Sequence, residues 1–166
     1  MSDVSLRPYV PSDVRRCVEI FRSSIEELAA DDYDADQREA WSSAADDEEA
    51  FAARLADALT LIAVVDEAAA GFASLRGGDV IDMLYVDPEY AGQGAGTALI
   101  DALVKLASGR GAKRLSVEAS EGAKALFERL GFTAQRRNLV RVGDEWLANT
   151  TMMKSLGADE PPPTRH

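Results

Sequence analysis

Three glycines lie at alternating positions between an apolar run and a helical pattern, in the segment VDPEYAGQGAGTALI from Val86 to Ile100. Glycines spaced this closely are entropically unfavourable, so they indicate a backbone that bends sharply or approaches another group closely. A strand that passes through such a turn into a helix presents free backbone N–H groups and the positive end of the helix dipole. The segment therefore predicts an anion site, best suited to phosphate, at Gly92, Gly94 and Gly96.

Two common phosphate motifs do not fit this turn. A P-loop requires Lys and then Ser or Thr after its last glycine, whereas Thr97 and Ala98 follow here. A dinucleotide fingerprint requires a glycine where Thr97 stands, and it follows the first strand of its fold, whereas several elements precede this turn. A strand-to-helix turn that binds nothing is the remaining alternative.

The hydrophobic pattern predicts an α/β order of elements. The first part of the chain predicts a strand over Leu6–Tyr9. Helices are predicted over Asp13–Ala29, from Asp34 onward, and over Asp47–Ala58. The runs LTLIAVVD, GFASLR and DVIDMLYVD predict three antiparallel strands. The glycine turn is followed by a helix, the strand KRLSVEA, the helix SEGAKALFERLGF that ends at Gly131, and two strands around the turn VGDE. The strand–helix–strand unit over Val80–Ala119 is expected to be parallel.

Two motifs and the order of elements resemble the GNAT superfamily of N-acetyltransferases. VDPEYAGQGAGTALI resembles its coenzyme A motif, Gln/Arg-x-x-Gly-x-Gly/Ala after a V-x-P strand end, and SEGAKALFERLGF resembles its second motif helix. The resemblance covers Val4 to Leu156, and DDYDADQREAW and NTTMMK are similar to a bacterial branch of the family. It implies an α/β GNAT-type acyl-CoA N-acyltransferase fold with a central mixed, mostly antiparallel, splayed sheet flanked by helices. We expect one such domain over residues 1–156 and a disordered, proline-rich tail over 157–166.

The resemblance also implies acetyl-CoA as the co-substrate and transfer of its acetyl group to a primary amine, on a small molecule or a peptide, by direct attack in a ternary complex. The strand Leu115–Ala119 would splay away from its neighbour, and the thioester would lie in the gap. Tyr33 and Trp41 belong to the region that roofs the acceptor pocket in the family. The backbone would pair with pantetheine at Leu84, Tyr85 and Val86, and would hold the pyrophosphate at Gly92, Gln93, Gly94, Ala95, Gly96 and Thr97.

Three residues depart from the family pattern. Ala91 stands where the family has Gln or Arg, and Ser120 stands where an asparagine often contacts pantetheine. Phe127 stands where many members have the tyrosine that protonates the departing thiolate, and a phenylalanine has no proton to donate. Water, Ser120 or Tyr85 are the possible substitutes. The departures at Ala91 and Phe127 favour an alternative function, a module that binds coenzyme A or acyl-CoA without catalysis.

Two carboxylates are candidates for the base that deprotonates the amine. Along VIDMLYV, strict alternation places Val80, Asp82, Leu84 and Val86 on one strand face, where family members often have a Glu or His. An acid in so apolar a run is unusual, because burying it unpaired is costly. The alternative is that Asp82 only pairs with a nearby arginine or a backbone N–H. Glu118, in LSVEAS, is the second candidate, and either acid can act through water.

Composition excludes several other functions. The formal net charge of −11 argues against binding to nucleic acid or to anionic membranes. No apolar run approaches the ~18 residues of a membrane span, and the first residues lack the pattern of a signal peptide, so we expect a cytoplasmic location. We expect the protein to be a monomer or a homodimer. Cys17 and His166 are the single cysteine and the single histidine. They cannot form a disulfide, a zinc cluster or a Ser–His or Cys–His catalytic pair, and we expect no metal.

Overall fold

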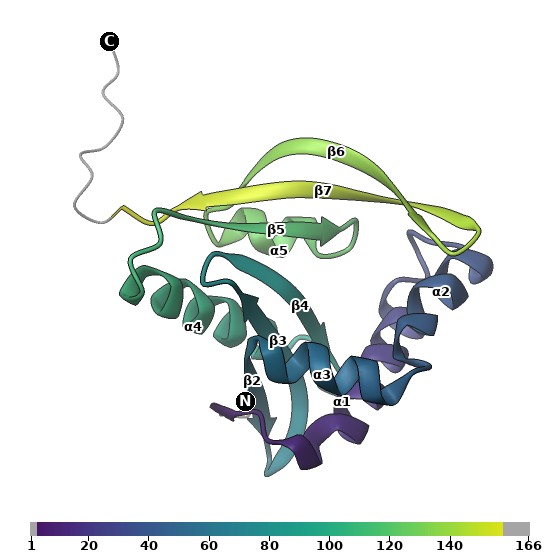
Figure 1. Ribbon diagram of the computed structural model, residues 1–166, viewed down its shortest axis with the longest axis horizontal. Coiled ribbons are helices and arrows are strands. Elements are labelled where there is room, and N and C mark those ends of the chain that lie inside the picture. The colour runs from purple at the N-terminus through teal and green to yellow at the C-terminus, as the bar shows by residue number, and fades with distance from the viewer. Residues whose placement is uncertain (1–2, 158–166) are drawn as a thin grey trace.

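The helices and strands follow one another in the order that the hydrophobic pattern predicts (Figure 1). The computed structural model describes residues 3–157, so the tail predicted over 157–166 lies outside them except for Gly157. Its strands are β1 (Val4–Pro8), β2 (Leu59–Val65), β3 (Ala68–Arg76), β4 (Val80–Val86), β5 (Arg114–Ser120), β6 (Thr133–Val142) and β7 (Glu145–Ser155). Its α-helices are α1 (Val14–Ser23), α2 (Ala35–Ser42), α3 (Glu48–Asp57), α4 (Ala95–Gly109) and α5 (Lys124–Arg129). Within residues 3–157, no helix is long and apolar enough to cross a membrane.

The strands form one seven-stranded sheet in the order β1-β2-β3-β4-β5-β7-β6. All neighbouring strands are antiparallel except β4 and β5, which the helix α4 connects in parallel. This parallel pair includes only two residue pairs, Val80 with Ser116 and Ile81 with Val117. The sheet is therefore mixed, mostly antiparallel and splayed, as predicted, and β6 and β7 arch away from the half that contains β2, β3 and β4 (Figure 1).

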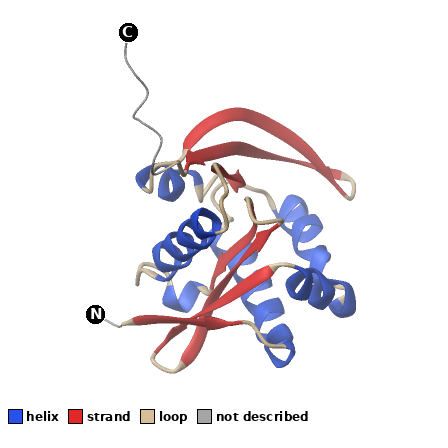
Figure 2. Ribbon diagram, turned by 60° about the vertical axis from the view of Figure 1, so that its left-hand side comes forward, coloured by secondary structure: helices blue, strands red, loops and turns tan. Residues whose placement is uncertain are grey.

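Helices cover both faces of the half-sheet formed by β2, β3 and β4 (Figure 2). Helices α1 and α3 pack on one face, where Phe21, Phe51 and Phe72 are each no more than 2% exposed. Helix α4 packs on the other face through Leu99 and Leu103, which are fully buried. The two cores share the sheet between them, so both faces of β4 are fixed by packing.

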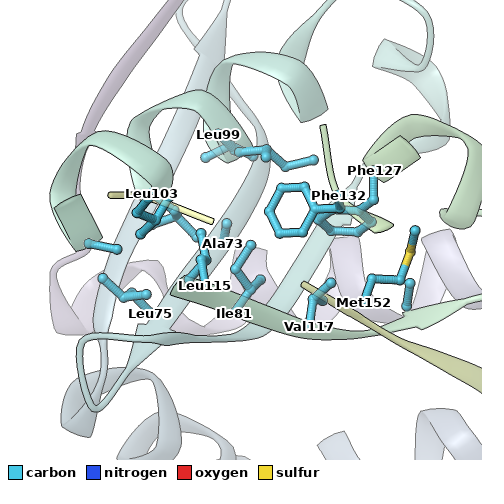
Figure 3. Packing of buried hydrophobic residues seen from close by; sticks show 14 of the residues in the cluster. Ala73, Leu75, Ile81, Leu99, Leu103, Leu115, Val117, Phe127, Phe132 and Met152 are labelled. Atoms are coloured by element: carbon cyan, nitrogen blue, oxygen red, sulfur yellow. The ribbon is translucent and has the colours of Figure 1, made fainter. Parts of the chain in front are cut away.

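The point where β4 and β5 part is filled by apolar side chains (Figure 3). Ile81 and Val117, which form one of the two residue pairs between these strands, are both buried in this cluster. Phe127 of α5 and Phe132 pack beside them with ring centroids 5.1 Å apart. Burial of these side chains holds the strands together at one end and leaves them free to separate beyond it.

The first helical segment is less regular than its sequence pattern. The pattern predicts one helix over Asp13–Ala29, but the α-helix ends at Ser23 and continues as a wider π-helical segment, η2, over Ser24–Leu28. Short π-helical insertions in proteins often occur at functional sites. Here the segment faces the open end of the splay.

The helix α2 is fixed at its start by side chains that the sequence identifies. Asp34 accepts a hydrogen bond from the N–H of Gln37, and the Gln37 side chain accepts one from the N–H of Asp34, both at 2.8 Å. This is the reciprocal capping pattern expected from the spacing. Gln37 also donates to the carbonyl of Trp146 at 2.8 Å, which joins α2 to the β6–β7 hairpin (Figure 1).

We expect the substitution Asp34→Ala to lower the free energy of unfolding by about 1 kcal/mol, because it leaves the N–H of Gln37 without its acceptor. Chemical denaturation measures this change. Asp36→Ala is the matched control, since Asp36 is exposed in the same helical turn and its side chain makes no hydrogen bond within the described residues. Equal losses in both variants would contradict a specific capping role.

Candidate active site

A groove opens where β4 and β5 separate. It has a volume of about 190 Å³ and lies between η2, the end of β4, and the helices α4 and α5. Its lining includes five of the eleven predicted coenzyme A contacts, at Leu84, Tyr85, Val86, Gly96 and Ser120. Beyond Ile81 no residue of β4 pairs with β5, so the edge of β4 that faces β5 offers its backbone groups to an extended partner.

The glycine turn provides free N–H groups at one end of this groove. Gly92 and Gly94 have φ values of 80° and 91°, a conformation that residues with a Cβ rarely adopt. Ala98 donates the first hydrogen bond of α4, to the carbonyl of Gly94 at 3.0 Å. The N–H groups of Ala95, Gly96 and Thr97 therefore have no partner within the helix, and Gln93 precedes them in the turn. This geometry suits a phosphate group.

Gly96 allows a close helix contact beside the groove. A Cβ at this position would lie 3.2 Å from Cδ2 of Leu126 on α5. The glycine therefore keeps α5 close to the start of α4, and with it the groove wall. Ala95 is buried, so only its backbone is directed toward a ligand at this turn.

A second, smaller cleft of about 70 Å³ joins the groove. The structure brings both candidate bases, Asp82 and Glu118, and the predicted contact Phe127 to its lining. The cleft and the groove share a junction, which we define by the residues that line both: Trp41, Leu84, Tyr85, Ser120 and Ala123.

Asp82 lies on the opposite strand face from the one that strict alternation predicts. Ser74 pairs with Met83 and Leu75 pairs with Ile81, so Asp82 is an extra residue on β4, a β-bulge. A bulge interrupts the two-residue alternation of side chains. The carboxylate consequently points toward α3, away from Leu84 and Val86, and this corrects the predicted face.

Two arginines neutralise the Asp82 carboxylate. Arg54 on α3 donates to its two oxygens at 2.7 and 3.1 Å, and Arg76 on β3 donates at 2.8 Å. The hydrogen bond to Asp82 raises the pKa of Arg54. The Asp82 side chain is only 8% exposed. These contacts match the alternative in which Asp82 pairs with nearby arginines, and they leave its oxygens poorly available to an amine.

Glu118 keeps one oxygen free of partners within the described residues. Its Oε2 accepts hydrogen bonds from Thr151 at 2.7 Å and from the amide of Asn138 at 3.0 Å. No hydrogen bond to its Oε1 occurs in this part of the chain, and the residue is exposed at the cleft. Asn138 and Thr151 lie on β6 and β7, and no sequence pattern identifies them because they reach Glu118 only through the strand register.

Phe127 is part of the core as well as of the cleft wall. It is 1% exposed, and its ring packs edge-on against Phe132 (Figure 3). Two residues of α5 and its N-cap line the cleft, Phe127 and Ala123. Neither side chain has a proton to donate. Another group must therefore supply any proton that is needed at this position.

Tyr85 and Trp41 form a polar pair at the junction. The indole N–H of Trp41 donates to the Tyr85 hydroxyl oxygen at 3.1 Å. Burial raises the pKa of Tyr85 to about 12, so its hydroxyl stays protonated at neutral pH. Phe21 packs edge-on against the Tyr85 ring, with centroids 4.7 Å apart, and this fixes the ring position.

Tyr33 has a bridging position and is 4% exposed. Its hydroxyl donates to the carbonyl of Ala148 on β7 and accepts from the N–H of Glu121, just after β5, at 3.0 Å. Burial raises the pKa of Tyr33 as well. Its ring packs edge-on against Trp41, with centroids 5.2 Å apart. Tyr33 thus packs against Trp41 without lining the cleft, whereas Trp41 lines the cleft itself.

Comparisons with known proteins relate most of this chain to one family. Residues 29–156 match the family model described as an acetyltransferase (GNAT) domain. The chain is 34% identical over 152 residues to the uncharacterized N-acetyltransferase YafP of Escherichia coli strain K12, a match that covers 92% of this chain and 96% of YafP.

Solved structures show the same fold. A crystal structure of a GCN5-related N-acetyltransferase from Rhodopseudomonas palustris, also described as an aminotransferase of class II, is 57% identical, with a TM-score of 0.92 over 94% of this chain and 98% of that one. The PaiA N-acetyltransferase of Thermoplasma acidophilum, solved in complex with coenzyme A, is 19% identical, with a TM-score of 0.77 over 92% of this chain and 99% of that one.

The two arginines around Asp82 generate a prediction for stability. Arg54→Met or Arg76→Met alone leaves the carboxylate one guanidinium, whereas the double substitution leaves a nearly buried charge unpaired. We expect the double variant to lose at least about 1 kcal/mol of unfolding free energy beyond the sum of the single losses. Denaturant unfolding of the three variants measures this coupling. Arg22→Met, which breaks an exposed pair with Asp46, is the control; additive losses at Asp82 would contradict the prediction.

Proposed function

Because this chain belongs to the GNAT family and is an N-acetyltransferase, we propose that it transfers the acetyl group of acetyl-CoA to a primary amine by direct attack in a ternary complex. The observation that carries the proposal is the separation of β4 from β5 after two residue pairs, directly beside a glycine turn that starts α4. The separation provides a slot for an extended thioester, and the turn provides an anion site at its end. Residues 1–156 would act as one unit.

The groove fits the two chemical parts of coenzyme A. The pantetheine arm carries amide groups, which suit the unpaired backbone of Leu84, Tyr85 and Val86 as an added strand would. The pyrophosphate would accept hydrogen bonds from the N–H groups of the turn, from Gly92 to Thr97. Because these donors belong to the main chain, the alanine at position 91 removes one side-chain contact and leaves the site in place.

Glu118 is our preferred base for the amine. The free Oε1 of Glu118 is exposed at the cleft, while Thr151 and Asn138 hold Oε2 and thereby fix the direction of the carboxylate. Asp82 is engaged by Arg54 and Arg76. For these reasons we place Glu118 ahead of Asp82, the reverse of the order that the sequence suggests. Removal of the ammonium proton by Glu118, directly or through water, would produce the nucleophile.

The remaining parts of the cleft would orient the reaction. Backbone N–H groups of β4 beyond Ile81, which do not pair with β5, would donate hydrogen bonds to a developing oxyanion. The Trp41 ring lines the junction between groove and cleft, and would exclude water from the thioester. The acceptor would be a small-molecule amine or a peptide amine that enters beside Glu118.

Binding of acetyl-CoA should depend on the charge at the glycine turn. Gly94→Asp places a carboxylate where the pyrophosphate is expected, whereas Gly94→Asn has nearly the same shape, tolerates the positive φ and carries no charge. We expect calorimetry to show at least ~2 kcal/mol weaker binding for Gly94→Asp than for Gly94→Asn. Equal affinities of the two folded variants would remove the phosphate from this turn.

The two carboxylates should differ in their effects on catalysis. We expect Glu118→Gln to lower kcat by about 100-fold or more at pH 7, and the loss to shrink at higher pH as free amine becomes abundant. Asp82→Asn should mainly lower stability, because it leaves two guanidiniums without their partner. Initial rates across a pH series measure both. If Asp82→Asn gives the pH-dependent loss and Glu118→Gln does not, Asp82 is the base.

A panel of amines tests the function itself. Polyamines, aminoglycosides, amino acids and peptides with free N-termini would each be mixed with acetyl-CoA, and the released thiol would be measured with a chromogenic reagent. We expect acetylation of at least one class, confirmed by a mass increase of one acetyl group on the amine. Tight binding of coenzyme A without turnover of any amine would favour the non-catalytic module.

A further inference from the structure

The leaving sulfur of the thioester has no donor at the position where the family most often provides one. Phe127 occupies that position and is buried against Phe132. The junction of groove and cleft contains two side-chain hydroxyls, those of Tyr85 and Ser120. The contacts around these two hydroxyls differ, and the difference identifies one of them.

We propose that the Tyr85 hydroxyl relays a proton to the departing sulfur of coenzyme A, with Trp41 as its positioning residue; this rests on the acetyl transfer proposed above. The indole N–H of Trp41 occupies one lone pair of the Tyr85 oxygen at 3.1 Å. Among the described residues, the hydroxyl hydrogen has no acceptor and the second lone pair has no donor. Tyr85 can therefore give and receive one proton at the same time.

Packing holds this hydroxyl in place. The Tyr85 ring lies between Phe21, at 4.7 Å, and Phe72, at 5.7 Å between centroids, while the Trp41 ring is 6.3 Å away. The hydrogen bond from Trp41 also polarises the phenol, because a hydroxyl that accepts a hydrogen bond becomes a stronger donor. Ser120 has neither an aromatic enclosure nor a hydrogen-bond partner for its hydroxyl in the described residues.

The proton balance of the step closes without an external acid. The amine nitrogen forms a bond to the thioester carbonyl carbon and still carries one proton more than the amide product. That proton passes to the free lone pair of the Tyr85 oxygen, while the original hydroxyl proton passes to sulfur as the C–S bond breaks. The products are a neutral amide and a neutral thiol, and Tyr85 has one proton before and after.

The raised pKa of Tyr85 suits a relay rather than an acid that ionises. With a pKa of about 12, the phenol remains protonated over the neutral range, and a lasting phenolate would be unfavourable in this site. No phenolate forms, because the Tyr85 oxygen receives one proton from the amine while it gives another to sulfur. Trp41 contributes by holding the oxygen and leaving its hydrogen free.

The kinetic test removes the phenol hydroxyl at position 85 and then adds one at position 127. We expect Tyr85→Phe to lower kcat by about 100-fold, with the affinity for acetyl-CoA nearly unchanged, because the ring and its packing stay. Phe127→Tyr in the Tyr85→Phe background should restore at least about tenfold of the rate, because it returns a phenol near the sulfur. An undiminished rate in Tyr85→Phe, or a loss that Phe127→Tyr does not repair, would overturn the proposal. A comparable loss in Ser120→Ala with none in Tyr85→Phe would assign the role to Ser120.

The role of Trp41 has its own readout. Trp41→Phe keeps an aromatic ring and removes the indole N–H, so it should lower kcat less than Tyr85→Phe does. If Trp41 acts through Tyr85, the double variant Trp41→Phe/Tyr85→Phe should be no slower than Tyr85→Phe alone. Multiplied losses in the double variant would show that Trp41 acts independently and would overturn its positioning role.

A measurement that needs no acceptor separates this proposal from the proposed function. A phenol that donates to sulfur stabilises the thiolate, so the thiol of bound coenzyme A should have a lower pKa in the wild type than in Tyr85→Phe, by about one unit or tenfold in thiolate stability. Thiolate absorbance during a pH titration of the complex measures it. Equal values would overturn the placement of the hydroxyl. A lowered pKa in a protein that acetylates no amine would contradict the function and support the placement.

Discussion

The short contact between β4 and β5 is the constraint on which the rest of the structure depends. Ile81 and Val117 are buried together and hold the two strands at one end. Beyond them the strands diverge, and α4, which connects them, must begin where β4 ends. The free edge of β4 and the free N–H groups of α4 therefore lie at the same opening. The groove and the free N–H groups beside it are both consequences of one parallel connection that stops early.

Much of this arrangement is encoded locally and could be predicted from the sequence. The strands and helices follow from hydrophobic spacing, the start of α2 from the Asp34 and Gln37 pair, and the sharp turn before α4 from the glycines after β4. Each of these features depends on residues within a few positions of one another. The family resemblance added the splay, which no local pattern encodes, and the two residue pairs between β4 and β5 confirm it.

The details of the site depend on contacts that the sequence does not display. One extra residue in β4 turned Asp82 toward α3, where Arg54 and Arg76 come from other elements. A bulge leaves no sequence signal here, because the surrounding run is apolar on both strand faces and does not mark the register. Glu118 gained its partners Asn138 and Thr151 through strand register, which side-chain spacing alone does not fix. The π-helical end of the first helix was likewise hidden in a continuous apolar stripe.

Tyr33 has a consequence for how substrates meet the protein. Its hydroxyl joins the connection after η2 to β7 and to the end of β5, on the side of the splay opposite Ile81 and Val117. The opening is thus bounded at both ends by contacts within the fold, and these contacts oppose a change in its width. Little ordering remains to be done on binding, so binding energy is not consumed in closing the site. A thioester and an amine would find the same shape whichever arrives first.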